Sequence, residues 1–174
     1  MLRRSFLSLL AATAATDALA LYDPPPQVLL DYVPGTWRGT LTYRDWGKPD
    51  RLVELPCRVN ASLLGPTSVS LSFLFDDGPG KQVHSYDRWL FDFFKREMVW
   101  VSGADREERS LYAIESAKLT DAGSAIALTR TVDGKAFRQQ LVSSQQSLRL
   151  TKVEVSSDGQ EIFRNAYDLR RTDV

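Results

Sequence analysis

Apolar and polar residues alternate in a series of short runs along most of the chain. In the run 68–75, for example, Val69, Leu71 and Phe73 alternate with serines. A period of two is typical of a strand with one face buried and the other in solvent. The alternation predicts about ten strands, over 37–43, 53–60, 68–75, 83–90, 97–102, 109–118, 124–132, 136–143, 147–155 and 160–171.

Turn-forming residues separate these runs. Asp-Gly pairs at 77–78, 133–134 and 158–159 are favoured in two-residue hairpins, where both central residues need positive φ. Even spacing and short turns indicate a meander of neighbouring antiparallel strands. We therefore predict an all-β fold, a single antiparallel up-and-down barrel of about 8–10 strands, because closure leaves no exposed edge.

The segment 88–98 fits two patterns, because Trp89, Leu90, Phe93 and Phe94 also fall at helical spacing. Two strands around a turn near 92–96 are the preferred interpretation. A helix over the whole segment is the alternative.

The N-terminal residues have the order of an export signal. Two arginines stand at positions 3 and 4, and an uncharged, largely apolar run follows them over 5–16. Ala18 and Ala20 place small residues at the two positions that a signal peptidase reads. We predict a cleavable signal peptide over 1–20 and a periplasmic or secreted protein. An N-terminal core helix is the alternative.

The export route depends on how the first residues are interpreted. Residues 3–7, Arg-Arg-Ser-Phe-Leu, resemble a twin-arginine signal. The charged region is very short for that route, so the general secretory route is preferred.

A proline-rich arm is predicted over 21–34, before a single domain over 35–174. Pro24, Pro25 and Pro26 are extended and cannot pair within a central strand. After them, 27–32 is expected to form a short helical turn that covers part of the domain.

Charge and length exclude several classes of partner. The chain has 22 basic and 22 acidic residues, a balance that argues against a nucleic-acid or anionic-membrane partner. The apolar run 5–16 is shorter than the about 20 residues that span a bilayer, so no membrane span is predicted.

Cys57 is the single cysteine and follows the apolar period of its strand, which predicts a buried thiol. The oligomeric state is left open.

The first strand opens with Gly35-Thr36-Trp37. This Gly-x-Trp sequence resembles the opening signature of lipocalins and related calycin barrels, and 35–43 resembles small bacterial lipocalin-like domains. The resemblance implies that an arginine of the last strand packs across Trp37 and closes the base of the barrel. Arg170 and Arg171 are the candidates, and Arg164 is a weaker one.

No catalytic, metal or cofactor site is predicted. The chain lacks a G-x-S-x-G elbow, a P-loop and a dinucleotide-binding glycine motif. His84 is the single histidine, and the strand period places Ser85 and Asp87 on the opposite face from it. One cysteine and one histidine are too few for a structural zinc site.

A barrel interior with many aromatic residues and a few polar anchors is the usual composition of a ligand pocket. The preferred hypothesis is therefore an exported barrel that binds a small apolar or amphipathic molecule. An inward arginine could bind a ligand carboxylate, since a buried arginine needs a partner. The arginines within strands are Arg58, Arg130, Arg138, Arg149 and Arg164, and Arg138 or Arg149 is the expected anchor. The expected lining is Tyr43, Tyr86, Trp89, Trp100 and Tyr112.

Two other functions are kept open. A filled barrel would act as an envelope or protein-interaction module through an exposed aromatic patch at 89–94. A small-barrel isomerase, cyclase or decarboxylase would instead place a glutamate of raised pKa beside an interior tyrosine. The glutamates on predicted strands are Glu54, Glu97, Glu115 and Glu154.

Overall fold

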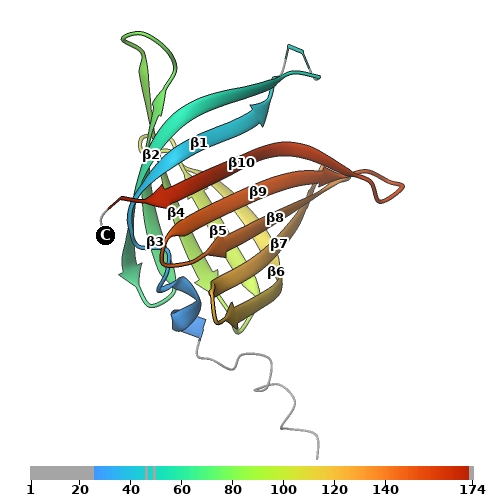
Figure 1. Ribbon diagram of the computed structural model, residues 1–174. Coiled ribbons are helices and arrows are strands. Elements are labelled where there is room, and N and C mark those ends of the chain that lie inside the picture. Colours follow the sequence, from blue (N-terminus) through green and yellow to red (C-terminus); the bar gives the residue numbers. More distant parts are fainter. Residues whose placement is uncertain (1–25, 46, 49, 173–174) are drawn as a thin grey trace, which may run out of the picture.

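The computed structural model describes residues 26–45, 47–48 and 50–172. The predicted signal peptide, 1–20, lies outside these residues. The described chain forms one closed barrel of ten strands, each antiparallel to both neighbours, in the order β1-β10-β9-β8-β7-β6-β5-β4-β3-β2 (Figure 1). The predicted all-β up-and-down barrel is therefore confirmed.

A short 3-10 helix precedes the strands, as the predicted turn near 27–32 suggests. The elements are η1 (Pro26–Leu30), β1 (Gly35–Arg44), β2 (Leu52–Gly65), β3 (Ser68–Asp76), β4 (Gln82–Asp92), β5 (Glu97–Ser102), β6 (Glu108–Thr120), β7 (Gly123–Val132), β8 (Lys135–Ser143), β9 (Ser147–Val155) and β10 (Glu161–Arg171). The segment 88–98 is the β4–β5 hairpin rather than a helix.

One of the three Asp-Gly pairs forms a two-residue hairpin turn. Asp133 and Gly134 both have positive φ, 51° and 76°, and connect β7 directly to β8. The other two pairs lie in longer loops, where Gly78 and Gly159 have positive φ but the aspartates do not. The expectation of two-residue turns at 77–78 and 158–159 is wrong, because those loops also use neighbouring residues to reverse the chain.

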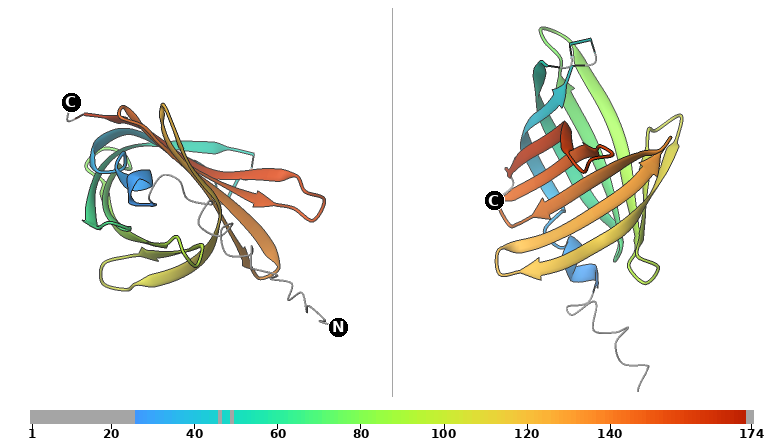
Figure 2. Two further views of the ribbon diagram at one scale, coloured as in Figure 1. Left: turned by 90° about the horizontal axis from the view of Figure 1, so that it is seen from below. Right: turned by 90° about the vertical axis from the view of Figure 1, so that its right-hand side faces the viewer.

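One end of the barrel is closed by η1 and the segment after it. Leu29, Leu30 and Val33 are fully buried with Trp37, and Figure 2 shows η1 inside the ring of strands at this end. The Ser124 hydroxyl donates to the Leu29 carbonyl at 2.6 Å, which ties the segment to β7. The apolar residues of this segment thus replace solvent at one end of the barrel.

The first and last strands meet at Trp37 and Arg171, which are opposite each other in the β1–β10 register. The Arg171 guanidinium lies 4.2 Å from the centre of the indole ring. It also donates to the Pro34 and Tyr32 carbonyls, at 2.6 and 3.0 Å, and to the Gln145 carbonyl at 2.6 Å. Arg171 occupies the position implied for the closing arginine, whereas Arg170 is exposed.

The same pair of strands approaches closely at Gly39. A Cβ atom at this position would lie 1.9 Å from the Asp168 carbonyl oxygen. Only glycine fits this approach, so Gly39 is required by the backbone of the β1–β10 seam.

We expect Arg171→Met to lower the free energy of unfolding by about 2–4 kcal/mol, because three carbonyls and the indole face lose a charged partner. Arg170→Met, the matched control at the adjacent exposed position, should change it by less than about 0.5 kcal/mol. Urea denaturation of both variants measures the difference. Equal losses in the two would show that Arg171 has no special part in closure.

Candidate functional site

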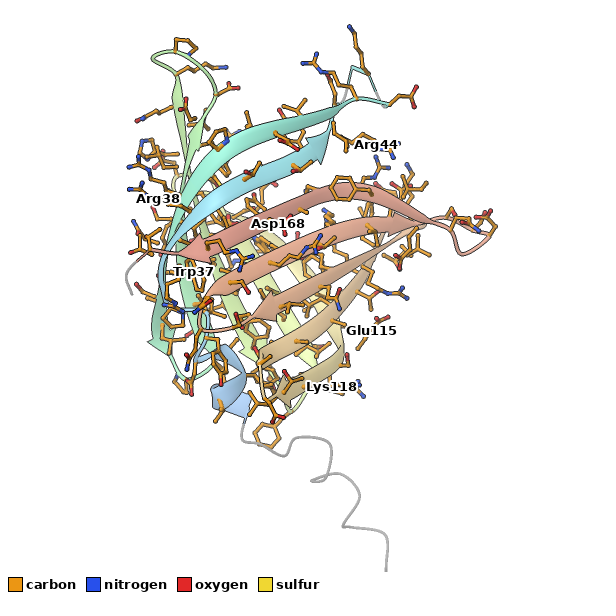
Figure 3. The ribbon with its side chains drawn as sticks, in the orientation of Figure 1. Trp37, Arg38, Arg44, Glu115, Lys118 and Asp168 are labelled. Atoms are coloured by element: carbon orange, nitrogen blue, oxygen red, sulfur yellow. The ribbon has the colours of Figure 1, made fainter. Side chains whose placement is uncertain are left out.

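The interior of the barrel changes from apolar to polar between its two ends. Figure 3 shows the two ends of β1, with Trp37 toward the closed end and Arg44 at the far end. Near Trp37 the inward side chains are apolar and buried. Toward Arg44 the inward positions include basic and amide side chains, and two cavities lie among them.

The outer cavity has a volume of about 560 Å³ and lies at the end opposite η1. Its walls are largely apolar and aromatic, and its rim is charged. Its lining comprises Leu41, Tyr43, Phe137 and Tyr167, with Arg44, Asp45, Lys135, Lys152, Glu154, Arg164 and Asn165.

The inner cavity is smaller, about 220 Å³, and lies among β5 to β10. On β8 and β9 it reaches one inward position deeper than the outer cavity, at Gln139 and Leu150, and on β6 it extends to the exposed Glu108. It shares Lys152, Asn165 and Tyr167 with the outer cavity, so the two adjoin at these residues. Its lining comprises Trp100, Ser102, Glu108, Ser110, Tyr112, Arg130, Gln139, Leu150, Lys152, Asn165 and Tyr167. A void of about 10 Å³ beside Phe73 and Trp89, toward the closed end, is too small for a ligand.

The rim of the outer cavity contains an ion-pair cluster. Glu154 pairs with Arg164 and, at 3.7 Å, with Lys135. The hydrogen bond from Arg164 lowers the pKa of Glu154 below its usual value. Glu154 is therefore an ionised partner of two cations, and it does not have the raised pKa that the enzyme hypothesis requires.

Arg130 and Lys152 form the basic part of the inner cavity. The Arg130 guanidinium lies 5.0 Å from the centre of the Tyr112 ring, and the Lys152 ammonium lies 5.1 Å from that of Phe137. Burial lowers the pKa of Lys152, and the positive charges of Arg130 and Arg164 lower it further. Both cations thus face the interior in a desolvated setting.

Tyr112 and Gln139 complete this polar group. The Gln139 amide donates to the Tyr112 oxygen at 3.0 Å, and both side chains are buried. Burial raises the pKa of Tyr112, so its hydroxyl stays protonated at neutral pH.

Asp87 is a buried carboxylate in the same half of the barrel. Burial raises its pKa to about 6, and a hydrogen bond from Trp100 limits this rise. Burial also raises the pKa of Tyr167, and the negative charge of Asp87 adds to that rise.

Of the aromatic residues expected to line a pocket, Tyr43 borders the outer cavity, and Trp100 and Tyr112 border the inner one. Trp89 is buried in the filled part of the core, with its ring 5.3 Å from that of Trp100. Tyr86 borders neither cavity, because it alternates with the inward Asp87 along β4.

Neither expected arginine anchor lies inside the barrel. Arg138 pairs with Glu161 at 2.8 Å and Glu115 at 3.4 Å on the outer face. Arg149 pairs with Asp168 at 3.1 Å and is also exposed. The expectation of Arg138 or Arg149 as anchor is wrong, because side chains alternate along each strand and both positions fall on the solvent face.

The basic residues that do face inward continue the buried period of their strands. Arg130 follows Ile126 and Leu128 at a spacing of two, and Lys152 follows Leu148 and Leu150 in the same way. This spacing was available in the sequence as a signal for inward cations. Gln139 lies between Phe137 and Leu141 at the same spacing, and Asn165 precedes Tyr167 and Leu169 in the same way, so the sequence carried a comparable signal for both.

The other chemistry sought in the sequence is not assembled. His84 is exposed while Asp87 is buried on the other face, as the strand period predicts. Among the described residues, no three His, Cys, Asp or Glu side chains are grouped to bind a metal. Cys57 is buried, which raises the pKa of its thiol to about 11.

The aromatic segment 89–94 does not form an exposed patch. Trp89, Phe91 and Phe93 are buried, and Phe94 alone among its aromatic residues is exposed, at 92%. The interaction-module hypothesis thus loses the surface on which it depended. In the described part of the chain, no helix has the length and apolar character needed to span a membrane.

Neither a protein-family model nor a curated protein matches the chain. Solved structures do resemble it. Rv2717c from M. tuberculosis has a TM-score of 0.60 at 13% identity, covering 85% of this chain and 98% of its own. The S-type phycobiliprotein lyase CpeS from Guillardia theta has a TM-score of 0.54 at 10% identity, covering 83% of this chain and 90% of its own. At these identities the likeness shows a shared barrel fold and no more.

We expect Asp87 to lower the stability of the folded state as pH rises through the range in which it ionises. Its pKa is about 6 in the fold against 3.8 for an ordinary aspartate. Since the folded state holds the proton more tightly, the stabilisation is present at pH 4 and lost above pH 6. Asp87→Asn should remove this contribution, so that stability at pH 7.5 relative to pH 4.5 rises, and should raise stability at pH 7.5 by about 1–3 kcal/mol.

Urea denaturation at pH 4.5 and 7.5 measures both effects. Asp168→Asn removes an exposed carboxylate and is the matched control, expected to change stability by less than about 1 kcal/mol. An unchanged slope in Asp87→Asn would contradict the assignment.

Proposed function

We propose that the protein is a carrier that binds a small amphipathic molecule inside its barrel. The observation that supports this most directly is the outer cavity of about 560 Å³, at the end of the barrel that η1 does not cover. This volume falls within the about 300–1,000 Å³ of small-molecule sites.

The composition of the two cavities suits such a ligand. Leu41, Tyr43 and Phe137 offer an apolar wall to a hydrocarbon or aromatic body. The polar side chains of the inner cavity offer hydrogen bonds to a polar end. A purely structural barrel would gain more from apolar residues at these interior positions, because buried polar groups are costly unless they are paired.

Export is part of the proposal. The order of charged, apolar and small residues over 1–20 supports a cleaved signal, and the resemblance of 35–43 to small bacterial lipocalin-like domains is consistent with a periplasmic or secreted carrier.

The export proposal is tested by producing the full chain in a bacterial host. We expect the mature protein to begin at Leu21, as measured by the intact mass of the periplasmic fraction. A chain in which Arg3 and Arg4 are both lysine should still be exported if the general secretory route is used. Retention of uncleaved protein in the cytoplasm would contradict export.

Binding is tested with the neutral fluorescent amphipath N-phenylnaphthylamine. We expect the protein to enhance its emission and saturate at one site. Asn165→Trp should weaken binding by about fivefold or more, since Asn165 lines both cavities and a larger side chain would occupy them. Asn60→Trp, at an exposed position on β2, is the matched control.

Saturable binding that Asn165→Trp weakens and Asn60→Trp does not would support the carrier. Equal binding in all three proteins would place the probe elsewhere and contradict it.

A further inference from the structure

We infer that the ligand is a carboxylate and that its acidic group binds in the inner cavity, between Arg130 and Lys152. This inference rests on the proposed carrier function and specifies which class of amphipath the cavity takes. It also sets the orientation of the ligand, with its acidic group inward and its apolar body toward the open end.

The first support is an excess of positive charge without a counter-ion. Arg130 and Lys152 line the same cavity, and no carboxylate among the described residues forms an ion pair with either. The Nε atom of Arg130 is buried and has no hydrogen-bond partner within the described chain. Buried cations are costly unless an anion compensates them, so a ligand carboxylate would supply the missing partner.

The second support is a positioned neutral donor. Gln139 donates to the Tyr112 oxygen, so the Tyr112 hydroxyl can direct its own proton to a ligand. Gln139 is 4% exposed, and its Oε1 atom has no partner in the described chain. A guanidinium, an ammonium and a hydroxyl are thus directed to one small cavity, and charged hydrogen bonds of this kind favour a carboxylate.

Acidic side chains near the cavity do not neutralise this group. Glu108 borders it but is exposed, and Asp87 accepts a hydrogen bond from Trp100 and forms no ion pair with either cation in the described chain. Glu154 is occupied by Arg164 and Lys135 at the rim. Arg164 and Lys135 therefore already have a partner at the rim, whereas Arg130 and Lys152 have none in the described chain. Arg44 at the rim also has a buried Nε atom without a partner there, but it stands alone, whereas the inner cavity brings two such cations together.

The depth of the site decides the orientation. The inner cavity, about 220 Å³, accommodates a small acidic group, while the wider outer cavity has the apolar wall of Leu41, Tyr43 and Phe137. A ligand with its acid at the rim would leave Arg130 and Lys152 uncompensated and place its apolar end among them.

The test compares dodecanoate with dodecanol, which share a chain and differ in the acidic group. Each displaces N-phenylnaphthylamine from the full protein, and the two displacement constants are compared at pH 7.5. We expect dodecanoate to bind about tenfold more tightly or better than dodecanol. Arg130→Met and Lys152→Met should each remove most of this preference while leaving dodecanol binding within about twofold.

Arg138→Met and Arg149→Met are the matched controls, because they remove outward arginines from β8 and β9. Both should keep the preference for dodecanoate. Tyr112→Phe removes a single hydroxyl and retains the ring, so it perturbs the fold least and should still reduce the preference for dodecanoate over dodecanol. It tests the site even if Arg130→Met or Lys152→Met fails to fold.

The outcomes separate the inference from the proposed function. If N-phenylnaphthylamine and dodecanol bind but dodecanoate has no advantage, the carboxylate site is wrong and the carrier stands. If none of the three binds, the carrier itself is wrong. An advantage that persists in Arg130→Met, Lys152→Met and Tyr112→Phe would overturn the assigned site, and tighter binding of dodecyl phosphate than of dodecanoate would overturn the carboxylate class.

Discussion

Closure of the barrel depends on the contact between Trp37 in the first strand and Arg171 in the last. The guanidinium covers the indole face and binds three carbonyls from segments that approach this end of the barrel. Closure also fixes the β1–β10 register, and because side chains alternate along a strand, a slip of one residue would turn the interior outward. The set of residues that face the cavities is therefore fixed by this seam.

The closed end has a direct consequence for the other end. Since η1, Val33 and Trp37 fill the interior near the seam, a ligand has room only toward the opposite loops. The interior there becomes polar: Asp87 and Lys152 are largely desolvated, and Arg130 is half-buried with its Nε atom out of solvent. Such groups reduce the stability of an empty barrel, so the same residues that make binding favourable are expected to make the fold less stable.

The cations illustrate how the same residue type acquires opposite roles. Arg138 and Arg149 pair with carboxylates in solvent, where an ion pair contributes little. Arg130, on the neighbouring strand to Arg138, faces the interior without a carboxylate partner in the described chain. A one-residue difference in strand phase thus separates a surface charge from a candidate ligand-binding group.

The sequence by itself determined the strands and their antiparallel order, because period-two alternation and turn residues are local properties of the chain. The closing role of Trp37 came from the resemblance of its Gly-x-Trp sequence to calycin barrels. The period-two alternation of the sequence also places Arg130 and Lys152 on the inward face of their strands, although Arg138 or Arg149 is the anchor that the sequence analysis expects. Only the tertiary structure decided which interior positions are filled and which are hollow. Cavity volume depends on how side chains from strands distant in sequence pack together, as Leu41, Phe137 and Tyr167 do, and no local pattern encodes that packing.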